Sequence, residues 1–368
     1  MTIVLDARTA TDHFPGIGRY VVNLASALKS IAPTLDLSLL IDPAAPVNRL
    51  TLPDLPVIAC PIGPFAPQQQ WRVPRQLRDL KATLYHSPYY LMPYRPGVPT
   101  VLTAYDVIPL IYPQYYTVTQ RLIFRVAHAL ALRTARVVLA ISEATKRDLI
   151  QRLGVPASKI VVTSLAADPC FVPQTAVSFH AMREKHALPE NYVLYFGSNK
   201  PHKNLPRLVE AFSKSAFSIQ HSAIHLVIAG SWNIRYGEAK RLAASNDRIH
   251  FIGPVSEADL PALYGGATVF AFVSEYEGFG LPPLEAMACG TPVIASNTSS
   301  LPEVVGDAGL LVDPRDVNAI AAALDRVLGD VDLQLDLKQR GLDRAAQFSW
   351  ARTAQQTLNV YQSIGTAN

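Results

Sequence analysis

Cysteine is scarce in this chain of 368 residues, and the three cysteines lie far apart. Cys60, Cys170 and Cys289 form no Cys-x-x-Cys pair and have no histidine at the spacing of a zinc site, so neither a disulfide framework nor a structural zinc is expected. Uncharged apolar runs of about 18 residues are also missing, which argues against a membrane-spanning helix. Residues 1–6 lack the basic start and long apolar core of a signal peptide and predict a first strand. These absences together favour a cytoplasmic protein.

Charge is distributed unevenly along the chain. Residues 1–170 carry 17 Lys and Arg against 10 Asp and Glu, a net charge of +7, whereas the remainder carries 16 against 19, a net charge of −3. A basic N-terminal half favours an anionic partner, such as a phosphorylated or lipid-linked substrate or an anionic membrane surface. Nucleic acid is not expected as a partner, because basic and aromatic residues are not interleaved.

Four basic residues recur every three positions over 72–81 and would share one face of a helix. They are Arg72, Arg75, Arg78 and Lys81. Such a face fits either peripheral contact with an anionic membrane or an ordinary solvated helix surface.

Short apolar runs alternate with helical patterns along the whole chain, which is typical of doubly wound α/β folds. Seven strands are expected in the first half and six in the second, the first at Ile3–Leu5 and the last at Leu310–Val312. The polar, proline-punctuated segment Asp168–Thr175 separates the two sets. The sequence therefore predicts an α/β protein of two Rossmann-like domains facing across a cleft, residues 1–170 and 171–349, with ligands at the carboxyl ends of the strands.

The most informative segment contains two glutamates, Glu277 and Glu285, separated by seven residues. The preceding Ala267–Val273 predicts a buried strand, and the following residues predict a helix that prolines open at 282–283 and that Gly290 ends. A strand that leads through a glycine-containing loop into a helix N-terminus can bind an anion, because the first helical N–H groups have no internal partner.

Because proline lacks an N–H, an anion in this loop would be held by the three main-chain N–H groups that precede the prolines. They belong to Phe279, Gly280 and Leu281, after Gly278. Helical side chains lean toward the helix N-terminus, so Glu285 points back at the loop, where a carboxylate can accept two hydrogen bonds from a diol such as ribose. The plain alternative is a surface loop with two solvated glutamates.

The segment Glu277–Glu285 and the run ACGTPVIASNTSSLPEVVGDAGLLVDPRD at 288–316 resemble the nucleotide-sugar signature of retaining glycosyltransferases of family 4, which have the GT-B fold. The resemblance implies that Glu285 binds the ribose of the donor nucleotide, that Glu277 contacts the transferred sugar, and that the N–H groups at 279–281 lie near the diphosphate. It also implies that the final helix, within 350–368, packs back on the N-terminal domain.

A second loop, Gly197–Asn204, follows an expected strand and precedes a helix that Asn204 could cap. Lys203 would then stand at a helix N-terminus, placed to neutralise a diphosphate. The resemblance implies donor contacts from Ser198, His202 and Lys203. Relatives carry an arginine at the position of His202, and histidine is mostly neutral at pH 7, so the positive charge would rest on Lys203 and the helix ends. A solvated turn is the alternative.

Three further donor contacts rest on the resemblance alone. Gly16 and Gly18 precede an expected helix, too far from the first strand for a dinucleotide fingerprint. The corresponding glycine loop of family 4 enzymes closes over the donor phosphates. Ile252 lies in the region whose backbone meets the nucleobase.

Polar residues end two expected strands of the N-terminal half, His86 and Asp106, and would point toward the ligand. Tyr105-Asp106 looks like the family's His-Asp pair with tyrosine in place of the histidine that approaches the transferred sugar. A phenol can position a hydroxyl but carries no positive charge at neutral pH. His86 is either an acceptor contact or a satisfied, partly buried histidine.

The resemblance implies a retaining, metal-independent hexosyltransferase in which Glu277, Lys203, Asp106 and Tyr105 surround the reacting groups. It would move mannose, with GDP-mannose the preferred donor and UDP-sugars as alternatives, to a glycan or lipid-linked glycan, as in bacterial mannosyltransferases of surface-polysaccharide synthesis. No cofactor is expected, and Asp330-Val-Asp332 matches a metal-binding DxD motif only by chance, since no apolar strand flanks it. The alternatives are a nucleotide-sugar 2-epimerase of the same fold and a catalytically silent nucleotide-binding partner.

Overall fold

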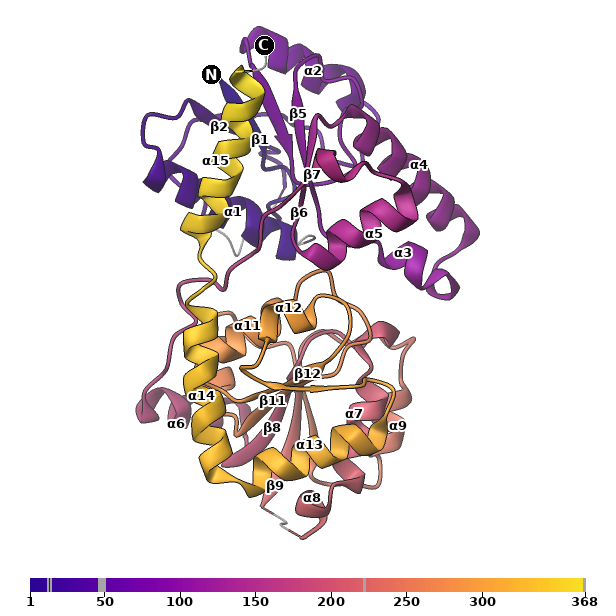
Figure 1. Cartoon of the computed structure of the whole chain (residues 1–368), viewed down its shortest axis with the longest axis vertical. Coiled ribbons are helices and arrows are strands. Elements are labelled where there is room, and N and C mark those ends of the chain that lie inside the picture. Colours follow the sequence, from indigo (N-terminus) through magenta and orange to yellow (C-terminus); the bar gives the residue numbers. More distant parts are fainter. Residues whose placement is uncertain (12, 14, 46–50, 221–222, 367–368) are drawn as a thin grey trace. The chain divides into compact units, whose positions relative to one another are not determined.

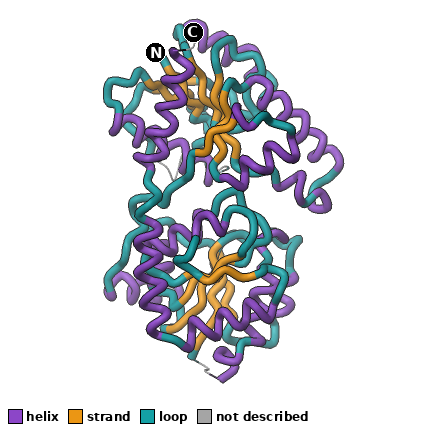
Figure 2. Tube along the Cα trace, viewed as in Figure 1, coloured by secondary structure: helices purple, strands orange, loops and turns teal. Residues whose placement is uncertain are grey.

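The computed structural model describes all residues except 12, 14, 46–50, 221–222 and 367–368. The chain divides into two compact units: unit 1 comprises residues 1–165 and 349–368, and unit 2 comprises residues 166–348. The sequence placed this boundary after residue 170. In each unit, helices cover a central sheet (Figure 1 and Figure 2).

Unit 1 is built on a seven-stranded parallel sheet in the order β3-β2-β1-β4-β5-β6-β7. Its strands are β1 (Ile3–Asp6), β2 (Leu37–Ile41), β3 (Val57–Ala59), β4 (Leu84–Ser87), β5 (Thr100–Ala104), β6 (Val137–Ala140) and β7 (Ile160–Val162). The strands β1, β4 and β5 are buried along their whole length, as expected where helices cover both faces of a parallel sheet.

The helices of unit 1 divide between the two faces of its sheet. They are α1 (Pro15–Ile31), α2 (Gln69–Asp79), α3 (Ile108–Ile111), α4 (Val118–Thr134), α5 (Glu143–Leu153) and α15 (Trp350–Thr366), with short 3-10 turns at Pro113–Tyr115 and Ala157–Lys159. Val73 of α2, Ala131 of α4 and Leu149 of α5 belong to one apolar cluster with alternate strand residues such as Tyr85 and Leu102. The side chains of α1 and α15 meet the intervening residues, so these two helices cover the other face.

Unit 2 contains a six-stranded parallel sheet in the order β10-β9-β8-β11-β12-β13. Its strands are β8 (Asn191–Phe196), β9 (Ile224–Ala229), β10 (Ile249–Gly253), β11 (Val269–Phe272), β12 (Val293–Ser296) and β13 (Leu310–Val312). Its helices are α6 (Ala176–His186), α7 (Leu205–Lys214), α8 (Ala216–Gln220), α9 (Glu238–Ala243), α10 (Leu260–Gly265), α11 (Leu281–Ala288), α12 (Leu301–Val305), α13 (Val317–Gly329) and α14 (Val331–Ala345), with a 3-10 turn at Pro201–Lys203.

The predicted α/β fold class is confirmed, because both units alternate parallel strands with helices in the Rossmann-like manner. The expected seven and six strands are the ones that form the two sheets. Among the described helices, none combines the length and the apolar character needed to cross a membrane.

Candidate functional site

The strand order of unit 2 reverses between β8 and β11, and the carboxyl ends of such strands are where doubly wound sheets form their ligand crevice; this position is here called the crevice of unit 2. These neighbouring strands lie where the order along the sheet reverses, because the chain proceeds outward from β8 to β9 and β10 but returns to β11 on its other side. Loops that leave such a pair in opposite directions form the usual ligand site of doubly wound sheets. They are residues 197–204 after β8 and 273–280 after β11, the two loops that the sequence singled out.

Lys203 and Glu277 join the two loops through an ion pair. The Lys203 Nζ atom donates to both carboxylate oxygens of Glu277, at 2.6 and 2.8 Å. The side chains are 18% and 11% exposed, and the ammonium also lies 5.2 Å from the centre of the Phe272 ring. The structure thus brings together the two residues predicted to be nearest the diphosphate and the sugar, in a partly shielded place where charge interactions are stronger than at an open surface.

The loop before α11 has its carbonyl groups tied to the neighbouring segment 299–300. The Ser299 and Ser300 hydroxyls donate to the Glu277 carbonyl at 2.5 and 2.9 Å, and Ser300 also donates to the Phe279 carbonyl. These bonds fix the peptide planes of the loop. Within the described part of the chain, no protein acceptor is found for the main-chain N–H groups of residues 279–281. They therefore remain able to bind an anion at the helix N-terminus.

Gly280 makes this loop possible. Its φ of +124° is strained for residues with a side chain, and a Cβ atom there would lie 2.9 Å from Leu301 Cδ2. Sequence reasoning identified the glycine but missed Ser299 and Ser300. Their Asn-Thr-Ser-Ser segment lies within the run at 288–316 that carries the family resemblance, so the signal was available.

Glu285 lies on α11, as expected, but its side chain is buried and not exposed at the surface. It is 3% exposed, and its Oε2 atom accepts a hydrogen bond of 2.9 Å from the Tyr264 hydroxyl. Tyr264, on α10, was not predicted, because only the tertiary fold brings α10 against α11. Ribose binding by Glu285 stays a prediction.

The loop after β8 differs from expectation in one detail. Asn204 precedes α7 but makes no side-chain cap, because it has a left-handed conformation with φ of +59°. Its amide instead donates to the carbonyls of Val273 and Pro314, at 2.9 and 2.6 Å. The capping prediction is therefore wrong, and Asn204 tethers the loop after β11.

Three more of the predicted donor contacts, Ser198, His202 and Ile252, belong to unit 2. Burial lowers the pKa of His202 to about 3, so this side chain is neutral at pH 7, and its carbonyl accepts a 2.7 Å bond from the Glu275 N–H. The Ser198 carbonyl accepts from the Tyr195 hydroxyl at 2.7 Å. Ile252 is half-buried in β10. All of these contacts are made within the protein, so donor binding by the three residues stays a prediction.

Unit 1 has a pocket of ≈ 300 Å³ at the carboxyl ends of β4 and β5, beside the first turn of α1. Its lining includes Gly16, Tyr89, Tyr90, Tyr105, Asp106 and His128. The rings of Tyr90, Phe124 and His128 form a cluster with centres 3.9 to 5.4 Å apart. The pocket is therefore largely aromatic, and only Tyr105, Asp106 and Gly16 of its lining were predicted. Tyr90, Phe124 and His128 come from segments that show no motif of their own.

The polar groups of this pocket are almost all neutral. Burial lowers the pKa of His128 to about 4, and its Nδ1 donates to the Phe124 carbonyl at 3.1 Å, which leaves Nε2 as an acceptor. Burial raises the pKa of Tyr105 well above its usual value. The Tyr105 hydroxyl is shielded from solvent and has no hydrogen-bond partner among the described residues. Asp106 accepts from the Ile108 N–H at 3.0 Å and so holds the start of α3.

Two predictions for unit 1 need correction. His86 is fully buried, and both ring nitrogens are occupied: Nδ1 lies 2.6 Å from the Tyr361 hydroxyl and Nε2 lies 2.8 Å from Thr103 Oγ1. It cannot contact an acceptor, and the alternative of a satisfied buried histidine is correct. Gly16 and Gly18 lie inside the first turn of α1, which begins at Pro15, and not in a loop before it. Proline is favoured at a first helical position, which explains the earlier start.

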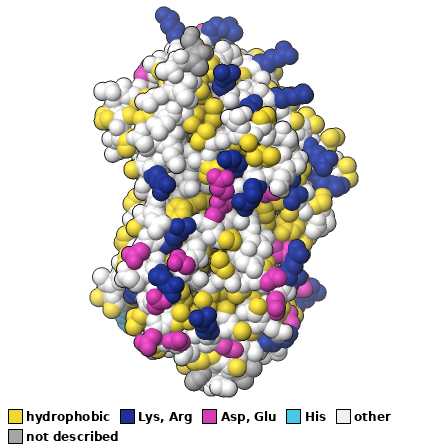
Figure 3. Space-filling view, viewed as in Figure 1, with side chains coloured by type: hydrophobic (Ala, Val, Ile, Leu, Met, Phe, Trp, Pro, Cys, Tyr) yellow, Lys and Arg dark blue, Asp and Glu magenta, His cyan; other side chains and the backbone are white. Residues whose placement is uncertain are grey.

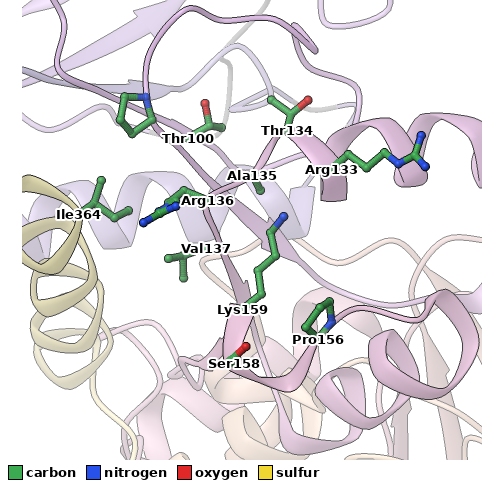
Figure 4. Close-up of a pocket in the computed structure, with 11 residues that line it drawn as sticks. Thr100, Arg133, Thr134, Ala135, Arg136, Val137, Pro156, Ser158, Lys159 and Ile364 are labelled. Atoms are coloured by element: carbon green, nitrogen blue, oxygen red, sulfur yellow. The ribbon is translucent and has the colours of Figure 1, made fainter. Parts of the chain in front are cut away.

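Another hollow, of ≈ 970 Å³, lies away from both of these places (Figure 4). Thr100, Val137 and Lys159 border it, so it lies at the amino ends of β5 to β7. Ligands of parallel α/β sheets bind at the carboxyl ends, and we therefore assign no catalytic role to this basin. Among the described residues, no group of three or more His, Cys, Asp or Glu side chains could hold a metal ion.

Comparisons with known proteins agree with this geometry. Residues 15–169 match the model of Glycosyltransferase Family 4, and residues 178–344 match that of Glycosyl transferases group 1. O-antigen chain mannosyltransferase B of Escherichia coli is 36% identical over 78% of this chain and 76% of its own length. The serotype-specific mannosyltransferase WbdA of Escherichia coli is 30% identical over 72% of this chain, which spans only 33% of that relative.

Solved structures give the same fold. The sucrose-phosphate synthase of Thermosynechococcus elongatus aligns over 100% of both chains, with a TM-score of 0.77 and 26% identity. The Anabaena protein Alr3699/HepE, solved with UDP and glucose, aligns over 99% of this chain and 100% of its own, with a TM-score of 0.76 and 20% identity. The fold and the crevice of unit 2 thus define a GT-B glycosyltransferase. The chain belongs to glycosyltransferase family 4.

Proposed function

We propose that this enzyme is a retaining mannosyltransferase that uses a nucleoside-diphosphate mannose, with GDP-mannose the preferred donor, and needs no metal ion. The acceptor is a hydroxyl of a glycan or lipid-linked glycan in the synthesis of a surface polysaccharide. The mannosyltransferase relatives support the sugar and the pathway class. UDP-sugars are the alternative donors.

The ion pair between Lys203 and Glu277 carries the proposal. Each charge compensates the other at 2.6 Å. A bound diphosphate would compete for the ammonium of Lys203, and the carboxylate of Glu277 would then be free to accept hydrogen bonds from hydroxyls of the sugar. The N–H groups of residues 279–281 add donors on the same side of the crevice.

The reaction would proceed on one face of the sugar. The bond from the anomeric carbon to the diphosphate breaks while the acceptor oxygen bonds the same face, and the acceptor proton passes to the leaving phosphate oxygen. Negative charge grows on the diphosphate as the bond breaks, so fixed donors at Lys203 and 279–281 would stabilise the transition state more than the bound donor.

The aromatic pocket of unit 1 suits the acceptor. Its rings can cover the apolar face of a sugar, and the neutral His128 Nε2 can accept from a sugar hydroxyl without attracting an anion. Tyr105 lines the pocket although its hydroxyl is shielded from solvent, and it is assigned a positioning role toward the acceptor.

The test is an incubation of the whole protein with GDP-mannose, with and without a mannose-terminated oligosaccharide. We expect mannose transfer only with the acceptor, retained anomeric configuration by nuclear magnetic resonance, and activity in the presence of a chelator. A donor sugar that changes without acceptor would indicate the epimerase instead. Nucleotide binding without transfer or donor hydrolysis would indicate a silent partner.

A further inference from the structure

Glu285 is one of three Asp and Glu side chains that are buried among the described residues. Carboxylates usually lie in water, and Figure 3 shows Asp and Glu side chains at the surface. The other two buried ones, Asp6 and Glu277, lie in ion pairs, and Glu285 accepts its 2.9 Å bond from the Tyr264 hydroxyl. A carboxylate in this position depends on such a partner, because burial removes water from it.

The ring of Tyr264 is fixed by three phenylalanine rings. Phe171, Phe196 and Phe270 have ring centres 5.8, 5.8 and 5.2 Å from its own, at interplanar angles of 71, 74 and 76°. Contacts of this edge-to-face kind favour one orientation of a ring. Since Tyr264 is also 0% exposed, its hydroxyl is held against Glu285 and does not swing toward solvent.

The main chain of Tyr264 is fixed as well. It lies near the end of α10, and its carbonyl accepts from the Thr291 hydroxyl at 2.7 Å and from the Ala267 N–H at 3.0 Å. Thr291 is buried and follows α11, the helix that carries Glu285. The end of α10 is therefore connected to α11 by the Tyr264 side chain and to the residues after α11 by the Tyr264 main chain.

A glutamate side chain needs such support to bind a diol in one geometry. Its terminal torsion is broad, so a carboxylate without a fixed partner can turn its plane away from a ligand. The Tyr264 hydroxyl restrains the Oε2 atom. A carboxylate has about four lone-pair sites on its two oxygens, so one bond from a tyrosine is compatible with two bonds from a diol.

We propose that Tyr264 is a positioning residue for the donor ribose. It holds the Glu285 carboxylate in the orientation that accepts both ribose hydroxyls, and the site thereby selects ribonucleoside diphosphates over analogues that lack these hydroxyls. A site built to bond a hydroxyl rejects the analogue without it, because a buried acceptor then loses its partner. The inference rests on the proposed function and on ribose binding by Glu285, and it adds the residue that makes this binding selective.

Unit 2 contains a matched control in Tyr192. It is 0% exposed, like Tyr264, and its hydroxyl donates at 2.8 Å to the main-chain carbonyl of Leu263. Tyr192→Phe and Tyr264→Phe each remove one buried hydroxyl and keep the ring. Only the second removes a group that contacts Glu285, so a difference between the two variants reports the carboxylate and not the general loss of a hydrogen bond.

The experiment is calorimetric titration of the whole protein with GDP and with 2′,3′-dideoxy-GDP. The corresponding UDP pair is included so that base preference does not decide the outcome. We expect the wild type to bind the dideoxy analogue about tenfold or more weakly. Tyr264→Phe should raise the Kd of the ribonucleotide about fivefold and that of the analogue less than about twofold, which lowers the discrimination to about two- to fourfold. Tyr192→Phe should preserve the discrimination.

Two further measurements separate positioning from structural support. With GDP-mannose, Tyr264→Phe should raise KM about fivefold and change kcat by less than about twofold, because the ribose is bound equally in the ground and transition states. In a Glu285→Ala background, Tyr264→Phe should raise the Kd for GDP by less than about twofold more, because its effect passes through the carboxylate.

Three outcomes would overturn the proposal. Equal losses for GDP and its dideoxy analogue in Tyr264→Phe would assign the hydroxyl to stability alone. Additive losses from Tyr264→Phe and Glu285→Ala would show that the tyrosine does not act through the glutamate. Equal wild-type affinity for the two nucleotides would contradict ribose binding by Glu285, and mannose transfer, measured separately, would then decide whether the proposed transferase function stands.

Folding of each variant is verified by its Tm without nucleotide, and keeping the ring avoids a cavity. Thr291→Val is a second route to the same test, because it removes the 2.7 Å bond to the Tyr264 carbonyl and leaves the Tyr264 hydroxyl in place. It should lower the discrimination about twofold. If neither Tyr264→Phe nor Thr291→Val changed the discrimination, the carboxylate would be positioned without Tyr264.

Discussion

The two sheets of this enzyme place chemically different sites at their carboxyl ends. The crevice of unit 2 holds a charged pair, Lys203 and Glu277, and free main-chain N–H groups. The pocket of unit 1 is lined by aromatic rings and by a histidine that burial keeps neutral, with Asp106 as the acidic residue of the lining. The same fold thus joins opposite charges in one unit and surrounds a carboxylate with neutral rings in the other. A diphosphate needs the first kind of site, and a neutral sugar hydroxyl is bound best by the second.

The largest effect is expected from removing the Lys203 ammonium, which pairs with Glu277. Lys203→Ala should lower kcat with GDP-mannose by about 100- to 1,000-fold, the usual effect of losing one donor to transition-state charge. Lys214→Ala is the control, since Lys214 forms a 2.7 Å pair with Glu210 at an exposed position of the same unit. Initial rates at saturating donor measure the effect. If both variants behaved alike, the leaving diphosphate would not be stabilised by Lys203.

The second largest effect is expected on nucleotide affinity, from a change at Glu285. Glu285→Ala should raise the Kd for GDP about tenfold or more, because two hydrogen bonds from ribose to a carboxylate are lost. Titration calorimetry provides the Kd, and Glu210→Ala provides the control. Glu285 is buried, so the Tm without nucleotide must be measured alongside to separate lost folding from lost binding. An unchanged Kd in a folded variant would contradict the ribose assignment.

Acid should destabilise the fold through its buried histidines. The pKa values of His86, His128 and His202 are lowered by burial to about 3, 4 and 3. The unfolded chain, with pKa values of about 6.5, therefore binds more protons, and the free energy of unfolding should fall as the pH drops from about 6.5 toward 3.

His128 provides the test of this pH dependence. His128→Phe keeps a ring in the cluster with Tyr90 and Phe124, and it should flatten the decline of Tm with pH. His180→Gln, at an exposed position, should leave the slope unchanged. A slope that did not respond to His128→Phe would show that this histidine is protonated equally in both states.

The smallest effect is expected from Tyr105→Phe. Removing a buried hydroxyl without a partner should raise the stability by up to about 1 kcal/mol, since no hydrogen bond is lost. The KM for the acceptor should change by less than about twofold, because the ring that lines the pocket is kept, and the Kd for GDP should be unchanged. Acceptor kinetics and thermal unfolding measure the two quantities. A change in nucleotide affinity instead would mean that Tyr105 serves the donor.

Much of the crevice in unit 2 could be predicted because its residues follow one another along the chain. Glu277, Gly280 and Glu285 lie within nine consecutive positions, and the strand, loop and helix that carry them have local signals. The pairing of Lys203 with Glu277 was not predicted, because only the order of the strands in the sheet brings the two loops together. Asn204 was misassigned because its partners, Val273 and Pro314, are remote in sequence.

The pocket of unit 1 was predicted less well for the same reason. Tyr90, Phe124 and His128 meet only when α4 packs beside the end of β4, and no spacing signals the meeting. His86 ends a strand in the way that functional residues do, but Tyr361, far along the chain, occupies its ring. The exposure of Val118, Leu122 and Val126 on α4 could not be predicted either, because a sequence pattern cannot tell which of two apolar sides faces the sheet.

The fold class, the strands and the loops predicted to hold a diphosphate follow from the sequence, because apolar periodicity, glycine and proline act on the backbone locally. The tertiary structure decided which polar side chains remain available for chemistry. Partners distant in sequence occupy the ring of His86, and burial keeps His128 and His202 neutral. The packing of two loops joins Lys203 to Glu277. Hydrogen-bond satisfaction and desolvation depend on neighbours in space, and the order of residues along the chain does not specify them.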